Sequence, residues 1–128
     1  MLLAASTVVV SAYQREYYIS TGQQIKTWTP SYPEAQAVVF YYPHEKGTRT
    51  VSIWHDMYIN DDEYGITEYY WKDTSNPNDT WHKFHQEAFG FLFRTNVKLW
   101  SGSNTIGYKF VITNYDDDQD LFVKVKVY

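Results

Sequence analysis

The sequence predicts one all-β domain over residues 1–128, a single antiparallel β-sandwich of the immunoglobulin-like or jelly-roll type with eight or nine strands. Three observations indicate this fold. Apolar residues alternate with polar ones in several runs, turn-forming residues separate these runs, and aromatic residues, which favour strands, make up 20% of the chain. Because alternation buries only one side of a strand, a second layer must cover that side.

The last third of the chain carries the clearest alternation. In residues 105–113 and 121–128 every second residue is apolar, so these apolar side chains share one side of each strand, whereas Lys124 and Lys126 point to the other side. The stretch 114–120 between them is too polar and too acidic for a strand. We therefore expect a long terminal hairpin with one buried face and one solvated face.

The first half of the chain follows the same patterns. Residues 7–19 predict one long strand or two shorter ones, and residues 25–29 a short edge strand that is ended by prolines. Residues 35–42 and 48–54 predict two further strands. The turn between them contains Gly47, which can adopt a positive φ.

The remaining segments are less regular. Residues 65–71 predict a strand and residues 96–100 a short one, with polar loops around them. The stretch 81–93 is divided, because its first half fits one or two helical turns and its second half alternates as a strand. Residues 2–12 are similar to a short signal h-region, but they lack a positive n-region, so we favour a first strand over a leader.

Composition limits the classes of partner. The formal net charge is −4, and the sequence shows no basic cluster, which argues against nucleic acid because phosphate binding needs concentrated Lys and Arg. We expect the isolated lysines to lie on solvated strand faces, where such residues ordinarily protect against aggregation. They are Lys98, Lys109, Lys124 and Lys126. The chain has no Cys to form disulfides, and no apolar stretch long enough to span a membrane. We favour an extracellular location.

No catalytic motif stands out, and we expect a protein that is not an enzyme. The sequence has no Gly-x-Ser-x-Gly motif, no Cys nucleophile and no glycine-rich phosphate loop. His82 and His85 have a spacing that could share a zinc ion, but a zinc site needs at least a third ligand. We favour packing or surface roles for these histidines.

Two acidic loops are candidates for calcium binding. Carboxylates at such density supply the hard oxygen ligands that calcium takes, and like charges repel one another without a cation. The alternative is that Asn and Asp simply form turns and keep strand ends soluble. The stronger candidate metal ligands are Asp116, Asp117, Asp118 and Asp120.

The aromatic residues are the main functional signal. Thirteen Tyr and five Trp outnumber seven Phe, and the polar edges of Tyr and Trp suit half-solvated surfaces. Such rings can stack on sugars, or they can fill the core. Trp54 and Trp71 are the best candidates for exposed platforms, with Tyr69 beside Trp71. The candidate ligand-binding residues are Trp54, Tyr69, Trp71, Trp81, Trp100 and Asn60.

Several short motifs resemble the immunoglobulin-like starch- and glycogen-binding modules. The matching residues are Glu45-Lys46, Thr50-Val51, Trp54, Asp79-Thr-Trp81 with Phe84, Tyr108-Lys-Phe110 and Asn114-Tyr-Asp-Asp117. The family's terminal Trp/Tyr-Asp-Asn-Asn motif is replaced here by Asn114-Tyr-Asp-Asp-Asp118. The resemblance covers residues 35–120 and implies a non-catalytic, glycan-binding sandwich.

A second resemblance is to calcium-dependent phospholipid-binding sandwich domains. It depends on Asn76-Pro77 followed by Trp81 and Phe84, without the paired-Asp loops of that family. Two functional hypotheses result from these observations. The first is a carbohydrate-binding module for a polysaccharide or oligosaccharide. The alternative is a structural subunit of a capsid, filament or matrix that assembles as a homo-oligomer through its terminal strands.

Overall fold

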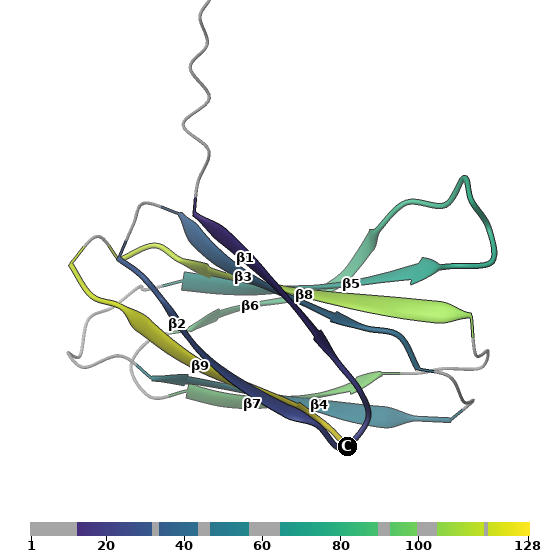
Figure 1. Cartoon of the computed structure of the whole chain (residues 1–128), viewed down its shortest axis with the longest axis horizontal. Helices are drawn as coiled ribbons and strands as arrows, with labels where there is room; N and C mark the ends of the chain where they lie inside the picture. Colours follow the sequence, from purple (N-terminus) through teal and green to yellow (C-terminus); the bar gives the residue numbers. More distant parts are fainter. Residues whose placement is uncertain are drawn as a thin grey trace, which may run out of the picture.

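The computed structural model describes residues 13–31, 34–43, 47–56, 65–89, 93–99, 105–116 and 118–128. Over these residues the chain forms nine strands in two packed sheets, which Figure 1 shows as an upper and a lower layer. The five-stranded sheet has the order β1-β3-β8-β5-β6 and the four-stranded sheet the order β2-β9-β4-β7. The strands are Gln14–Ile19 (β1), Gln24–Thr29 (β2), Ala35–Tyr41 (β3), Arg49–Asp56 (β4), Gly65–Asp73 (β5), His82–Phe89 (β6), Phe93–Leu99 (β7), Ile106–Asn114 (β8) and Leu121–Val127 (β9).

The strand pairing confirms the predicted β-sandwich in its jelly-roll form. Four antiparallel pairs are nested inside one another, namely β2 with β9, β3 with β8, β4 with β7 and β5 with β6. This nesting distributes β2–β9 over two four-stranded sheets, as in a jelly roll. β1 adds a fifth strand at the edge of one sheet and pairs with β3 in parallel, so one pair departs from the antiparallel pattern.

The predicted terminal hairpin is wrong in its pairing, although both of its strands exist. β8 lies in the five-stranded sheet and β9 in the four-stranded sheet, so the acidic segment between them crosses from one layer to the other. The alternating residues of both strands are buried, including Phe110 and Ile112 in β8 and Val123 and Val125 in β9. The buried residues of β8 and those of β9 therefore face each other across the space between the two sheets, and they do not lie side by side on one sheet.

The predicted helical turns at the start of residues 81–93 are also wrong. His82–Phe89 is strand β6, which pairs with β5 through a β-bulge between Tyr69 and Tyr70. Backbone pairing with an existing sheet edge outweighs the weak helical pattern of so short a segment. Residues 1–12, for which a first strand or a leader was considered, lie outside the described residues. Among the described residues, no helix has the length and apolar character to cross a membrane.

Candidate functional site

The predicted ligand-binding residues do not form one row. Trp54 lies on the outer face of the four-stranded sheet, whereas Trp81 packs on the outer face of the five-stranded sheet. Tyr69 is 0% exposed, so the prediction that it is an exposed platform is wrong. The reason is that Thr67 and Tyr69 face inward, while the other side of β5 meets solvent. Trp100 and Asn60 lie outside the described residues.

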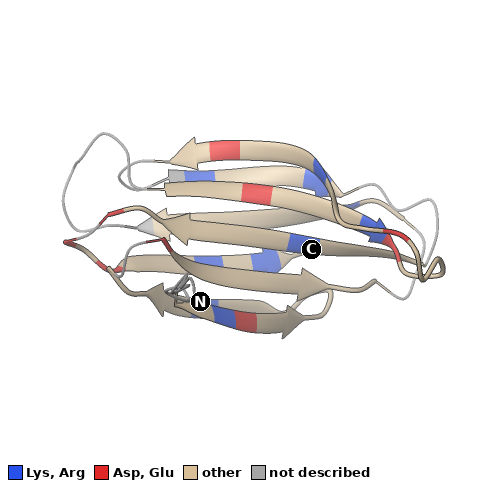
Figure 2. Ribbon diagram, turned by 90° about the horizontal axis from the view of Figure 1, so that it is seen from above, with Lys and Arg blue, Asp and Glu red and all other residues tan. Residues whose placement is uncertain are grey.

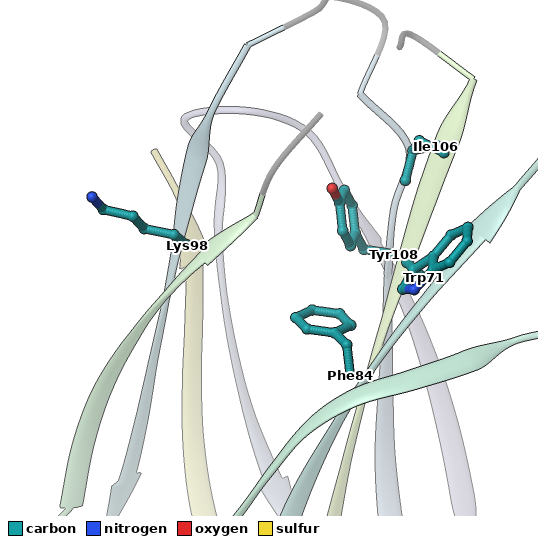
Figure 3. A pocket seen from close by; sticks show the side chains of 5 residues that line it. All are labelled: Trp71, Phe84, Lys98, Ile106 and Tyr108. Atoms are coloured by element: carbon teal, nitrogen blue, oxygen red, sulfur yellow. The ribbon is translucent and has the colours of Figure 1, made fainter. Parts of the chain in front are cut away.

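Trp71 points into a cavity at one end of the sandwich instead of outward. The cavity holds about 370 Å³ and is lined by Trp71, Phe84, Lys98, Ile106 and Tyr108. Figure 3 shows the rings of Phe84 and Tyr108 facing the cavity, while the ammonium group of Lys98 points away. Burial raises the pKa of Tyr108 to about 12, so its hydroxyl stays neutral. This lining is almost wholly apolar and offers few partners for sugar hydroxyls. The segment 100–104, which follows β7, lies outside the described residues, so we assign no ligand to the cavity.

A row of aromatic rings covers the outer face of the five-stranded sheet. We call this surface the aromatic face and define it by Tyr18, Phe40, Tyr42, Tyr70 and Trp81. The strand register places Tyr18 beside Phe40, and Phe40 beside Lys109, across β1, β3 and β8. Tyr18 is 65% exposed and Tyr42 39% exposed, so the two tyrosines offer ring surface to a ligand.

Three rings of the aromatic face, those of Tyr18, Phe40 and Tyr42, are nearly parallel. Tyr18 and Phe40 stack with ring centroids 5.0 Å apart and planes 18° apart. Tyr42 is parallel to Phe40 within 3°, at a centroid distance of 6.3 Å. Gly107 makes room for this arrangement, because a Cβ atom at that position would lie 2.6 Å from Cε1 of Tyr42. The position of the Tyr42 ring therefore depends on a glycine at this place in β8.

Polar groups border the aromatic face. Gln14 donates from Nε2 to Oε1 of Gln36 (3.2 Å), and Gln36 donates to Oγ1 of Thr113 (3.2 Å), so a row of hydrogen-bonding groups crosses the sheet below the rings. Lys109 lies over the rings of Tyr70 (4.7 Å) and Trp81 (5.0 Å). Burial lowers the pKa of Lys109 from its ordinary value, and burial with a hydrogen bond to a carboxylate raises that of Tyr70 to about 12.

The opposite outer face has a different character. Two cations lie over the indole of Trp54, the ammonium of Lys124 at 3.7 Å and the guanidinium of Arg94 at 5.1 Å. Trp28 lies on the same face, is 61% exposed and contacts Phe122. Trp28 was not among the predicted ligand-binding residues, although its alternation with Thr27 and Thr29 in β2 was a usable signal.

The carboxylates of the last acidic loop act as turn acceptors. Oδ1 of Asp116 accepts hydrogen bonds from the backbone N–H groups of Asp118 (2.7 Å) and Gln119 (3.0 Å), and Oδ1 of Asp120 accepts one from Ser31 (3.0 Å). Asp117 and the loop at 60–63 lie outside the described residues. Among the residues that are described, no group of three or more metal-ligating side chains occurs. Calcium binding here stays a prediction.

A polar network joins the two sheets between β6 and β7. Glu87 accepts hydrogen bonds from Thr95 (2.8 Å) and Tyr69 (3.2 Å), and its carboxylate lies 2.9 Å from Nε2 of His85. Burial alone would raise the pKa of Glu87, but these hydrogen bonds outweigh it and lower the pKa below its ordinary value. His82 instead contacts Asp79 at 2.6 Å, so the two histidines considered for zinc have separate carboxylate partners.

Comparisons with known proteins support the fold alone. No protein-family model and no curated protein matches the chain. Among solved structures, the pre-peptidase C-terminal domain of a collagenase from Bacillus anthracis is 14% identical, with a TM-score of 0.54 over 90% of this chain and 96% of that one. A Yersinia pseudotuberculosis-derived mitogen is 5% identical, with a TM-score of 0.53 over 80% and 81% of the two chains. A family 16 carbohydrate-binding module is 12% identical, with a TM-score of 0.41 over 86% of this chain and 73% of that one. The first two similarities agree with a β-sandwich, and the third is too low to carry an argument.

Proposed function

We propose that this protein is a non-catalytic carbohydrate-binding module that stacks a glycan on the aromatic face. The observation that carries the proposal is the parallel set of Tyr18, Phe40 and Tyr42 with Trp81 beside it on one solvated sheet face. Exposed rings gathered on one face of a soluble domain indicate a binding surface. Their apolar faces suit the C–H face of a sugar ring, and the hydroxyls of Tyr18 and Tyr42 stay available to water and ligand.

The border of the aromatic face supports a glycan over a purely apolar ligand. The side chains of Gln14, Gln36 and Thr113 form a continuous row of donors and acceptors on the same sheet face. Amide groups both donate and accept hydrogen bonds, as sugar hydroxyls do. This row lies four residues from Tyr18 and Phe40 along β1 and β3, so a glycan chain that runs along the strands would meet the rings and then the amides.

The affinity of such a site should be modest and should depend on individual rings. An aromatic contact contributes about 0.5–1.5 kcal/mol beyond its buried area, which corresponds to roughly a three- to tenfold change in Kd. We expect Tyr18→Ala with Tyr42→Ala to weaken binding roughly 10- to 100-fold, because Tyr18 and Tyr42 are the most exposed rings of the face.

Titration of tryptophan fluorescence with a panel of soluble neutral oligosaccharides tests the proposal. Tyr128→Ala is the matched control, since Tyr128 is 51% exposed but follows β9, which belongs to the other sheet. The expected result is binding that the double variant loses and the control keeps. A flat response to the whole panel, or an equal loss in the control, would contradict the proposed function.

The alternative function, assembly through the terminal strands, stays a prediction that the same samples can test. β9 is internal, paired on both sides with β2 and β4, whereas β1 forms an edge of the five-stranded sheet. Strand addition would therefore have to use β1 or another edge strand, and not β9. Light scattering of the concentrated protein should report a monomer if the glycan-binding proposal is sufficient.

A further inference from the structure

The outer face of the four-stranded sheet gathers positive charge from three strands that are far apart in the sequence. Figure 2 marks Lys and Arg within the strands, and several of the Asp and Glu positions at the loops at either end. We call the outer side of β2, β9, β4 and β7 the basic face. Its cations are Lys26, Arg94, Lys98, Lys124 and Lys126, five of the 11 Lys and Arg residues in a chain of net charge −4.

The register places three of these cations in one row across the sheet. Lys26 is directly opposite Lys124, which is directly opposite Trp54, which is directly opposite Arg94, so one row contains three cations around one indole. The next row contains Lys126 opposite Ser52. Lys98, Lys124 and Lys126 lie on a solvated sheet face, as predicted, but Lys124 is not isolated, because sequence distance hides its cross-strand neighbour Lys26.

No carboxylate compensates the basic face among its described side chains. The described outward side chains of the four strands belong to Gln, Lys, Trp, Phe, Thr, Ser, Asn and Arg residues, and none of the five cations makes an ion pair with another described side chain. Like charges directly opposite each other on neighbouring strands, as Lys26 and Lys124 are, destabilise a sheet. An anionic ligand would remove this cost on binding.

The face is hollowed where the cations converge. A depression of about 50 Å³ is lined by Gln24, Ser52, Trp54, Arg94, Lys124, Lys126 and Tyr128. Pockets that enclose a whole small molecule measure roughly 300–1,000 Å³, so this hollow suits a single carboxylate or sulfate group. Ser52 at its floor and Gln24 at its rim add hydrogen-bond donors to the positive charge.

We propose that the basic face is a second binding site, which takes a polyanionic polysaccharide and seats one carboxylate or sulfate group among Lys124, Lys126 and Arg94. The neighbouring cations Lys26 and Lys98 hold further anionic groups along the same chain. This proposal goes beyond the glycan site on the aromatic face, uses different residues and does not depend on it.

The rings of the basic face favour a polysaccharide over a single-stranded nucleic acid. Binding of single strands relies on free aromatic faces on which successive bases stack. Here the central indole of Trp54 already carries Lys124 from one neighbouring strand and Arg94 from the other. The exposed Tyr128 has Lys126 over its ring at 4.7 Å, so among the described exposed rings of this face only Trp28, which lies against Phe122, has no cation over it.

The test compares a charge-neutralised variant with a charge-matched control. The variant is Lys26→Gln with Arg94→Gln and Lys124→Gln, and the control is Arg15→Gln with Lys72→Gln and Lys83→Gln, three cations of the other sheet. Both lose the same net charge, so long-range attraction is equal. The probes are heparin for sulfate, polygalacturonate for carboxylate, dextran as a neutral polymer and oligo(dT) as a nucleic acid.

We expect the wild-type protein to bind heparin, polygalacturonate or both, with an affinity that falls as salt rises, and not to bind dextran through this face. The variant should bind roughly 10- to 100-fold more weakly, at about two- to fivefold for each exposed cation, while the control stays close to wild type. The heparin and polygalacturonate arms distinguish sulfate from carboxylate. Equal losses in variant and control, absence of polyanion binding, or tighter binding of oligo(dT) through the same residues would overturn the proposal.

Discussion

The two outer faces of the sandwich use the same two kinds of side chain in opposite ways. On the aromatic face rings contact rings, as Tyr18 does with Phe40, and the central cation, Lys109, is partly buried over two of them. On the basic face cations contact rings, as Lys124 and Arg94 do with Trp54, and the cations outnumber the rings. The neighbours of a ring thus decide what it can offer to a ligand: we propose that the rings of the aromatic face bind a neutral sugar, whereas the indole of Trp54 lies between two cations.

The largest effect is expected from a change in the core, because unfolding of the shared core would abolish binding on both faces. Tyr69 is fully buried and contacts Phe110 edge-on at a centroid distance of 5.7 Å. Tyr69→Ala should lower the free energy of unfolding by about 3–5 kcal/mol, a large part of the stability of a small domain. Urea denaturation measures this loss, and both binding activities should disappear with it.

The matched comparison is Tyr18→Ala, which removes an exposed ring of the same type. It should change the free energy of unfolding by less than about 1 kcal/mol, because Tyr18 is 65% exposed. A Tyr69→Ala protein of wild-type stability that lost only glycan binding would show that Tyr69 acts as a platform and would contradict the packing described above.

A second change should break the aromatic face and spare the basic one. In Gly107→Val the new side chain would meet the ring of Tyr42, whose Cε1 and Cδ1 lie 2.6 and 2.7 Å from the position of a Cβ atom. Displacing that ring should weaken neutral-glycan binding roughly three- to tenfold, with a stability cost of about 1–3 kcal/mol. Polygalacturonate binding should be unchanged. A loss of both activities at unchanged thermal stability would argue against two separate sites.

Acid should loosen the shared framework by protonating Glu87, while the lysines keep their charge. Because the pKa of Glu87 lies below its ordinary value of 4.5 in the folded chain, its contribution to stability is present above about pH 4.5 and is lost as pH falls through the folded pKa. Thermal unfolding between pH 6 and pH 3 measures this decline. Glu87→Gln should show a flatter dependence, and an identical slope in the variant would contradict the role given to Glu87.

The smallest expected effects come from a single charge on the basic face, where stability and binding should change in opposite directions. Lys26→Gln removes the like charge opposite Lys124 and should raise the free energy of unfolding at low salt by about 0.2–1 kcal/mol. The same change should weaken polyanion binding two- to fivefold. A purely structural lysine would give no such opposite pair of effects. A variant that loses stability and keeps its affinity would contradict the account.

The sequence predicted the layers of the fold better than their connections. Period-two alternation located the strands that contain Val123 or Phe110, because alternation is a local property. It could not show that these two strands belong to different sheets, since nested pairing depends on contacts between distant segments. The strand β6 was missed in part for the same reason, because pairing with β5 outweighs the weak helical pattern of its residues.

The candidate site was predicted less well. Tyr69 and Trp71 were assigned outward because the two sides of β5 look similar in sequence, with Thr67 and Tyr69 on one side and Ile66 and Tyr70 on the other. Tyr18 and Tyr42 can be recognised as parts of one surface only when their rings are seen to stack with Phe40. Gly107 can be recognised only from its close approach to the ring of Tyr42. Cross-strand neighbours of this kind follow from register, which a single sequence does not determine.

The most direct test of two separate faces is a titration with the best-binding neutral oligosaccharide in the presence and absence of saturating polygalacturonate. The account predicts the same Kd for the oligosaccharide in both titrations, with a complex that contains both ligands, because the aromatic and basic faces lie on opposite sides of the sandwich. Displacement of one ligand by the other would show a single shared site and would contradict the account.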